Sequence, residues 1–324
     1  MAEKLYREAV VDAIDEEMAR DETVFLLGED IGLFGGPFAT TKGLYEKYGP
    51  KRLMDTPISE AAIVGSALGC ALTGLRPIAE LMFIDFTGVC MDQIVNQVAK
   101  SRYMSGGHLM VPLVIRTQGG AGRSFAAQHS QSLEAWFMHT PGLKVVLPST
   151  PADAKGLMKS AIRDDNPVMY IEHKLLFTTT GEVPEGEYLT PIGKADVKRE
   201  GSDVSLISFS RMVLRCLEAA DLLAEEGINA EVVDLRSLTP LDMETVLESV
   251  AKTSRAVVVY EGCKNAGAGS EVAARLANEG FYLLDAPIKR VASLDCPIPF
   301  NKELEKAVIP ETSEIVRHVR KFFA

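Results

Sequence analysis

The sequence predicts an α/β fold with a mainly parallel sheet, divided into two domains. Short β-branched runs alternate with helical patterns along most of the chain, as expected where parallel strands are joined by helices. At 324 residues the chain also exceeds the size at which one hydrophobic core usually stops growing. A segment without periodicity, rich in Thr, Gly, Pro and Glu, follows Glu172. We therefore expect domains at residues 1–185 and 186–324.

The first half of the chain opens with apolar residues at helical spacing, namely Leu5, Ala9, Ala13 and Met18. Buried strands are indicated by the runs TVFLLGED (23–30), VPLVIRT (111–117), KVVLP (144–148) and PVMYIE (167–172). Helical patterns cover about 59–74, 86–104 and 151–164. The segment 178–194, TTTGEVPEGEYLTPIGK, is interpreted as a linker.

The second half repeats the alternation in a smaller domain. Its expected strands are DVSLISFS (203–210), NAEVVDLRSL (229–238), RAVVVYE (255–261) and FYLLDAP (281–287). Its expected helices cover about 211–226, 242–253 and 270–279. No transmembrane segment is expected, because the uncharged run 61–75 is shorter than the roughly 20 apolar residues that a bilayer requires.

Composition excludes several classes of function. The net charge of −11 disfavours nucleic-acid partners and anionic membrane surfaces, which are themselves negative. The five cysteines are odd in number and form no CxxC pair, so neither a disulfide framework nor a zinc site is indicated. The N-terminus matches neither a signal peptide nor an Arg-rich transit sequence. We expect a cytoplasmic protein.

Glu60 is a single carboxylate at the head of the uncharged run 61–75. Small residues recur on the same helix at Ala61, Gly65 and Gly69, and they allow another backbone to approach closely. An acid at a helix start is either a solvated partner of the helix dipole or a functional acid tuned by its surroundings. The residues alone leave both interpretations open.

Two further stretches carry candidate chemistry. Phe83 and Phe86 are either core aromatics, with Asp85 as a helix cap, or an apolar platform for an aromatic ring beside an acid. The glycine-rich stretch TQGGAGRSFAAQHSQSLEAW (117–136) contains His129 among small residues, which leave its imidazole room to act. Its glycines form either an anion-binding loop or simple turns.

A rival motif lies near Gly267. The strand RAVVVYE, the glycines of NAGAGSEV (265–272) and Asp285 resemble a dinucleotide fingerprint. Val272, however, stands where the third glycine belongs, and Gly267 comes only at the sixth position after Glu261, the end of the strand, whereas the fingerprint needs a tight turn. An NAD-binding oxidoreductase is therefore kept only as an alternative.

Several blocks in fixed order together resemble the beta subunit of the thiamin-diphosphate-dependent component of 2-oxoacid dehydrogenase complexes, over nearly the whole chain. These blocks are LGED, KRLMDTPISE, GLRPIAE, DQIVNQVAKSRYMSGG, AAQHSQSLEAWFMHTPGLKVV, PADAKGLMKSAIRDDNPVMYIEHK and VVDLRSLTPLD. The resemblance implies a pyrimidine-binding domain followed by a transketolase C-terminal-like domain. It also implies two beta chains assembled with two alpha chains, and docking to a dihydrolipoyl acyltransferase core.

The resemblance also implies roles for individual residues. Glu60 is then the acid that hydrogen-bonds the ring nitrogen of the cofactor's aminopyrimidine. Ile58 and Met82 contact the cofactor, and Phe86 packs on the aminopyrimidine. His129 reaches the reaction intermediate or the incoming lipoyl group. Glu29 and Asp92 match acids that line a proton path between two active sites in the family. A structural potassium site of the family is matched by four residues, namely Leu113, Ala161, Asp164 and Asn166.

One expected motif is absent from the chain. Enzymes of this kind bind diphosphate and magnesium through Gly-Asp-Gly followed some 25 to 30 residues later by paired asparagines, and no such pattern occurs here. The chain therefore supplies only the pyrimidine half of a thiamin diphosphate site, and an alpha subunit supplies magnesium and the diphosphate contacts. The blocks FGGPFATTKGLYEKYG and VLPSTPADAKGL most resemble the acetoin dehydrogenase branch, with pyruvate dehydrogenase as the alternative.

Overall fold

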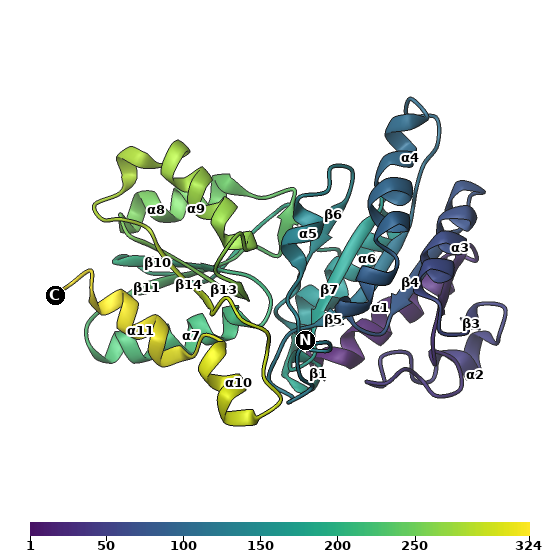
Figure 1. Ribbon diagram of the computed structural model, residues 1–324, viewed down its shortest axis with the longest axis horizontal. Coiled ribbons are helices and arrows are strands. Elements are labelled where there is room, and N and C mark those ends of the chain that lie inside the picture. The colour runs from purple at the N-terminus through teal and green to yellow at the C-terminus, as the bar shows by residue number, and fades with distance from the viewer. The chain divides into compact units, whose positions relative to one another are not determined.

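The computed structural model describes residues 1–324 and divides into two compact units. The first unit comprises residues 1–119 and 136–192, and the second comprises residues 120–135 and 193–324. Each unit contains its own sheet with helices packed on it (Figure 1). The α/β class predicted from the sequence is confirmed. The boundary at 185/186 stays a prediction, and the segment 120–135 belongs to the second unit although it precedes that boundary.

The first unit is built on a parallel sheet with the strand order β6-β7-β5-β4-β2-β3. Its strands are β2 (Val24–Gly28), β3 (Leu53–Asp55), β4 (Arg76–Leu81), β5 (Val114–Gly119), β6 (Lys144–Val146) and β7 (Val168–His173). Its helices are α1 (Tyr6–Arg20), α2 (Leu44–Tyr48), α3 (Glu60–Leu72), α4 (Ala99–Met104), α5 (Glu134–Met138, shared with the second unit) and α6 (Pro151–Arg163).

The apolar pattern of the sequence explains this layering. Every residue of β2, β5 and β7 is buried, as expected for parallel strands covered on both faces. Helices α1 and α6 pack side by side. The predicted amphipathic face of α1 is buried at Ala9, Ala13 and Met18.

Two predictions in this unit need correction. The region 86–104 is not one helix, because a 3₁₀ turn (Ile84–Val89) and a π-helix (Asp92–Val98) precede α4. Gly88 is a poor helix former, and the Thr87 hydroxyl donates to the Ile84 carbonyl at 2.6 Å, which favours the tighter turn.

The predicted linker also contains a strand. Residues Thr180–Val183 (β8) pair antiparallel with the N-terminal strand β1 (Ala2–Leu5). A short 3₁₀ turn, Leu176–Thr178, comes just before β8. The N-terminus thus supplies backbone partners that the composition of this segment does not reveal.

The second unit has the strand order β14-β13-β10-β11-β9, in which only β9 is antiparallel. The strands of this sheet are β9 (Asp196–Arg199), β10 (Val204–Ser208), β11 (Ala230–Asp234), β13 (Ala256–Cys263) and β14 (Lys289–Ser293). The short strand β12 (Ser237–Thr239) also falls within the residues of this unit but is not part of this sheet. Its helices are α7 (Met212–Glu225), α8 (Met243–Thr253), α9 (Ala268–Glu279), α10 (Lys302–Val308) and α11 (Thr312–Arg320). Figure 1 shows α8 and α9 on one face of this sheet and α7 and α11 on the other.

The strand predicted at FYLLDAP is wrong. Residues Phe281–Leu283 form a 3₁₀ turn, and the last strand of the sheet is β14. Phe281 and Tyr282 are 65% and 97% exposed, so these aromatic residues do not fill the core. Aromatic content alone favoured a strand here, but the apolar run has no burial to support it.

No helix in the structure combines the length and the apolar character that crossing a membrane requires.

Candidate active site

The candidate site of the first unit lies at the carboxyl edge of its parallel sheet. Gly28, the last residue of β2, is in register with Asp55 of β3 and Glu80 of β4. The chain therefore leaves the three strands at the same edge, where open α/β sheets bind their ligands. Glu29 and Met82 follow directly after β2 and β4.

Glu60 is the first residue of α3 and is only 9% exposed, whereas the neighbouring Ile58 is 75% exposed in the loop before the helix. Burial raises the pKa of Glu29, and the charges of Asp30 and Glu60 raise it further. Burial also raises the pKa of the Cys90 thiol to about 12, again with a contribution from Glu60. The Glu60 carboxylate thus acts electrostatically on side chains from two other segments of the unit.

An aromatic cluster stands at the same edge. Phe83 and Phe86 meet edge to face with ring centroids 5.5 Å apart, and Phe83 meets Phe38 in the same way at 5.9 Å. The ammonium group of Lys174 lies 5.1 Å from the centre of the Phe83 ring. Phe83 is buried, whereas Phe86 and Phe38 are half-buried, so Phe86 keeps part of its ring accessible to a ligand.

Gln118 fixes the turn that carries Met82. Its side-chain amide donates to the Met82 carbonyl at 2.5 Å, and Gln118 is fully buried on β5. The other amide atom, Oε1, has no hydrogen-bond partner within the chain. Because Leu81 is in register with Thr117, this bond extends the β4–β5 pairing by one side-chain contact. Gln118 lies in no motif that singled it out in the sequence.

A buried ion-pair triad lies behind this edge. The Arg116 guanidinium bonds Glu80 at 2.8 Å and Glu172 at 2.7 Å, and all three side chains are at most 2% exposed. Arg116 also donates to the Thr40 carbonyl at 3.3 Å. Burial raises the pKa of Glu172 although Arg116 lowers it. The triad was not predicted from the sequence, where the available signal was a charged residue within each of the segments that form β4, β5 and β7.

Asp92 begins the π-helix Asp92–Val98 and is exposed, with its carboxylate accepting from the Asn96 amide at 2.8 Å. The neighbouring Gln93 packs on α3 at Gly65, where an added Cβ would lie 3.7 Å from the Gln93 side chain. Gly69, by contrast, faces open space in this chain. Of the two glycines on α3, only Gly65 therefore has a neighbour within van der Waals contact of an added Cβ.

The four residues predicted to hold potassium gather where α6 ends beside β5. Leu113 directly precedes β5, and its carbonyl accepts from the Val168 N–H at 2.9 Å. The Ala161 carbonyl accepts from the Asp164 N–H at 3.3 Å. The structure thus brings Leu113, Ala161, Asp164 and Asn166 to one corner of the unit.

The side-chain oxygens at this corner already have protein donors. Asp164 accepts from the Asn166 N–H at 2.9 Å and from the Lys144 ammonium. Burial raises the pKa of Asp164, but hydrogen bonds from Lys144 and from the side chain and backbone of Asn166 outweigh it and hold the pKa below its usual value. Arg102 donates to the Asn166 side-chain oxygen at 2.7 Å. The Leu113 and Ala161 carbonyls also accept from N–H groups, but a carbonyl oxygen has a second lone pair, so a cation at this corner would use main-chain carbonyls as its hard oxygen ligands.

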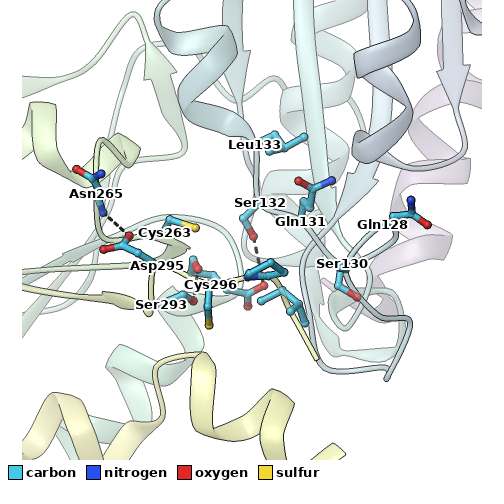
Figure 2. Close-up of a pocket in the computed structure, with 15 residues that line it drawn as sticks. Gln128, Ser130, Gln131, Ser132, Leu133, Cys263, Asn265, Ser293, Asp295 and Cys296 are labelled. Carbon is cyan, nitrogen blue, oxygen red and sulfur yellow. Dashed lines mark hydrogen bonds between the residues drawn. The ribbon is translucent and has the colours of Figure 1, made fainter. Parts of the chain in front are cut away.

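His129 lies in the loop 120–135 of the second unit and is half-buried. The loop borders a cavity of about 620 Å³. Figure 2 shows loop side chains on one side of the cavity and side chains that follow β13 and β14 on the other. The labelled lining residues are Gln128, Ser130, Gln131, Ser132 and Leu133, opposite Cys263, Asn265, Ser293, Asp295 and Cys296.

Two buried carboxyl groups lie near this cavity. Burial raises the pKa of Glu134 to about 7, and the charge of Glu261 adds to the shift. Glu261 lines the cavity, accepts from the Ala121 N–H at 2.7 Å and lies 3.4 Å from Arg211. The Ser130 hydroxyl is also buried and has no hydrogen-bond partner within the chain.

The glycines of the dinucleotide-like motif have a packing role. Gly267 caps α9 and Gly269 lies in its first turn, and a Cβ at either position would overlap the Tyr260 ring. Close contact between helix and strand explains these glycines without a nucleotide. All five cysteines of the chain are free thiols.

Comparisons with known proteins cover nearly the whole chain. Residues 2–179 match the transketolase pyrimidine-binding domain, and residues 193–315 match the transketolase C-terminal domain. The chain is 52% identical to the acetoin:2,6-dichlorophenolindophenol oxidoreductase subunit beta of Cupriavidus necator, over 99% of this chain and 98% of the relative. It is 47% identical to the mitochondrial pyruvate dehydrogenase E1 component subunit beta of Dictyostelium discoideum, over 97% of this chain and 90% of the relative.

Among solved structures, a split-gene transketolase described as an inactive beta4 tetramer matches with a TM-score of 0.80 and 26% identity, over 98% of this chain and 97% of that one. The predicted order of a pyrimidine-binding domain followed by a transketolase C-terminal domain is therefore confirmed. The family predicted from the sequence blocks is confirmed by full-length relatives at 45–52% identity. This chain belongs to the family of oxidoreductase beta subunits of the thiamin-diphosphate-dependent acetoin and pyruvate dehydrogenases.

Proposed function

We propose that this chain is the beta subunit of an acetoin dehydrogenase that cleaves acetoin oxidatively and passes the acetyl group to a lipoyl carrier. It acts with an alpha subunit and binds the pyrimidine half of thiamin diphosphate. The observation that carries the proposal is Glu60. This carboxylate is 9% exposed at the start of α3, at the carboxyl edge of the sheet in a domain of the pyrimidine-binding family.

The residues at this edge fit an aminopyrimidine. Glu60 holds a proton at the ring nitrogen, because a buried carboxyl group beside an apolar wall shares a proton readily with a basic nitrogen. The half-buried Phe86 offers a ring face for stacking, and the exposed Ile58 and the fixed Met82 complete the apolar wall. When bound, the cofactor supplies the nucleophilic carbon that attacks the substrate carbonyl.

Further residues act around this contact. Glu29 is the first proposed acid of a proton path between two active sites. Its electrostatic coupling to Glu60 supports this role, since the charge of Glu60 contributes to raising the pKa of Glu29. Asp92, exposed at the start of its helix, is the second proposed acid of this path between the two active sites. His129 acts on the reacting group or on the incoming lipoyl group from the loop 120–135.

The alpha subunit supplies magnesium and the contacts to the diphosphate, because this chain contains no motif for either. Titration of the isolated chain with thiamin diphosphate in a calorimeter tests this division. We expect binding at least 100-fold weaker than binding by the assembled enzyme. Equal affinity for the two would show that the chain holds the whole cofactor by itself.

Acetoin is preferred over pyruvate as the substrate. The chain is 52% identical to the beta subunit of an acetoin oxidoreductase and 47% identical to that of a pyruvate dehydrogenase. Turnover of the reconstituted enzyme with each substrate, measured by dye reduction, tests the choice. We expect a larger kcat/KM for acetoin, and a much larger value for pyruvate would assign the chain to the pyruvate dehydrogenases instead.

Potassium is proposed as a structural ion at the corner formed by Leu113, Ala161, Asp164 and Asn166. The main-chain carbonyls gathered there support the proposal. The side-chain oxygens of Asp164 and Asn166 already accept hydrogen bonds from Lys144 and Arg102. Thermal unfolding in potassium chloride and in choline chloride at equal ionic strength tests this site. We expect a saturable rise in Tm with potassium only. Identical Tm values would refute the site.

We also propose assembly into an alpha2-beta2 heterotetramer that contains a second beta subunit and docks to an acyltransferase core. An exposed apolar group at the end of α4 supports a subunit contact. Tyr103, Met104 and Met110 are 88%, 65% and 54% exposed, and clustered exposed apolar side chains mark interaction sites. The proposed location is cytoplasmic.

A further inference from the structure

We infer that Glu305 and Glu261 are positioning residues that hold the loop 120–135 in the conformation that presents His129. The inference rests on the role proposed above for His129. Both carboxylates belong to the second unit, as does the loop. Neither residue was singled out by the sequence.

Glu305 binds the start of the loop. It lies on α10, is 1% exposed, and uses its two carboxylate oxygens separately. One oxygen accepts from the Gly122 N–H at 2.7 Å, and the other accepts from the Ser124 N–H at 3.0 Å. Bonds from N–H groups to an ionised carboxylate are about twice as strong as neutral ones. A single side chain thereby fixes two alternate residues of the loop.

Glu261 binds the loop on both sides of His129. It lies on β13 and is 7% exposed. One of its oxygens accepts from the Ala121 N–H at 2.7 Å and from the Ser132 hydroxyl at 3.4 Å. Arg211, at 3.4 Å from the other oxygen, compensates the buried charge. A single carboxylate therefore binds the loop at Ala121 and at Ser132, on either side of His129.

The backbone of the loop needs such fixation. Gly120 and Gly122 have φ values of 88° and 99°, and the non-glycine residues Ser124 and Ala126 have φ values of 55° and 61°. Left-handed conformations are unfavourable for residues with a Cβ, and they persist only where the surrounding structure imposes them. The bonds from Glu305 to Gly122 and Ser124 lie within this strained run. Without them, we expect the loop to relax and His129 to move.

A purely structural anchor would stabilise the chain without acting through His129, so the test must separate the two roles. Glu305→Gln keeps the size of the side chain but removes its charge and directs an NH₂ group at backbone donors. Glu303→Gln is the matched control, because Glu303 lies on the same helix, is 78% exposed and pairs only loosely with Lys306 at 3.6 Å. If Glu305→Gln does not fold, Glu305→Asp retains the charge on a shorter side chain and takes its place.

Hydrogen exchange on the full-length chain gives the first measurement. In Glu305→Gln we expect the amides of residues 121–132 to exchange about tenfold faster than in the wild type. We expect no change in Glu303→Gln. Unchanged exchange in Glu305→Gln would overturn the inference.

Turnover of the assembled enzyme with lipoamide as acceptor gives the second measurement. Glu305→Gln should lower kcat about tenfold and leave the KM for thiamin diphosphate within twofold, because the proposed ring contacts lie in the first unit. In a His129→Ala background, Glu305→Gln should cause no further loss, since a positioning residue acts only through the residue it positions.

Three other outcomes would count against the inference. If Glu305→Gln lowered turnover as much in the His129→Ala background as in the wild type, Glu305 would be only a structural anchor. If the loop amides of Glu305→Gln exchanged faster but its turnover were unchanged, Glu305 would likewise be only a structural anchor. Wild-type turnover in His129→Ala itself would refute the proposed role of His129, and the exchange data would then show separately whether Glu305 holds the loop.

Discussion

The side-chain amide of Gln118 donates a hydrogen bond of 2.5 Å to the main-chain carbonyl of Met82. The bond joins a fully buried residue of β5 to the first residue after β4. It holds the chain where it leaves the sheet toward Phe83 and Phe86. The candidate wall of the pyrimidine site therefore depends on a residue outside that wall.

Replacement of Gln118 should weaken the binding of thiamin diphosphate to the assembled enzyme. Gln118→Met removes the donor at similar volume and leaves the Met82 carbonyl unpaired, a loss of about 1–3 kcal/mol. We expect the KM for the cofactor to rise about tenfold with kcat nearly retained. Gln118→Glu sets an acceptor against the carbonyl and should be worse. Wild-type kinetics in Gln118→Glu would contradict the positioning of Met82 by this bond.

Loss of Arg116 should strongly destabilise the chain. Arg116→Met leaves Glu80 and Glu172 buried without a counter-charge, which costs about 3–5 kcal/mol in comparable cases. Urea unfolding followed by circular dichroism measures the effect. Joint replacement of the three residues by apolar side chains should recover much of the stability.

The control for Arg116→Met is Arg275→Met. Arg275 forms an i,i+4 pair with Glu279 on α9 and is 36% exposed. Exposed pairs of this type contribute about 0.3–0.5 kcal/mol. If Arg116→Met were no more destabilising than Arg275→Met, the buried triad would not support the sheet.

Glu134 should make stability depend on pH. Burial raises its pKa in the folded chain from 4.5 to about 7, so the folded state retains a proton that the unfolded state releases. The contribution of Glu134 to stability is therefore most favourable below pH 4.5, falls as the pH rises, and above pH 7 is lower by roughly 3 kcal/mol. Glu134→Gln removes this penalty. Its stabilising effect should therefore be about 2 kcal/mol larger at pH 8 than at pH 5.

Unfolding free energies of Glu134→Gln and Glu271→Gln at the two pH values provide the measurement. Glu271 is exposed on α9, so its substitution makes the same charge change without burial. Equal pH dependence of the two variants would show that Glu134 does not retain its proton in the folded chain.

The sequence predicted those parts of the molecule that depend on local pattern. Apolar runs located β2, β5, β7, β10 and β13, and helical spacing located α3, α6, α7 and α8, because burial and period are visible in the residues themselves. The pairing of β8 with β1 was missed because it joins distant segments. FYLLDAP was misread because aromatic content does not reveal exposure.

The candidate site followed the same division. Glu60, Phe86 and His129 could be proposed from the sequence because they lie in distinctive motifs. Gln118 and Glu305 could not, since they were singled out by contacts with backbone groups far away in the sequence. Residues proposed to meet a ligand were therefore easier to predict from the sequence than residues proposed to position them.

The most direct test of the central claim is the turnover of assembled enzyme that carries Glu60→Gln. The substitution keeps the size of the side chain but removes the carboxyl group that we propose shares a proton with the cofactor. Glu22→Gln, at an exposed position before β2, is the control. We predict that Glu60→Gln lowers thiamin-diphosphate-dependent dye reduction by at least about 100-fold while the heterotetramer still assembles. Turnover within twofold of the control would contradict the account.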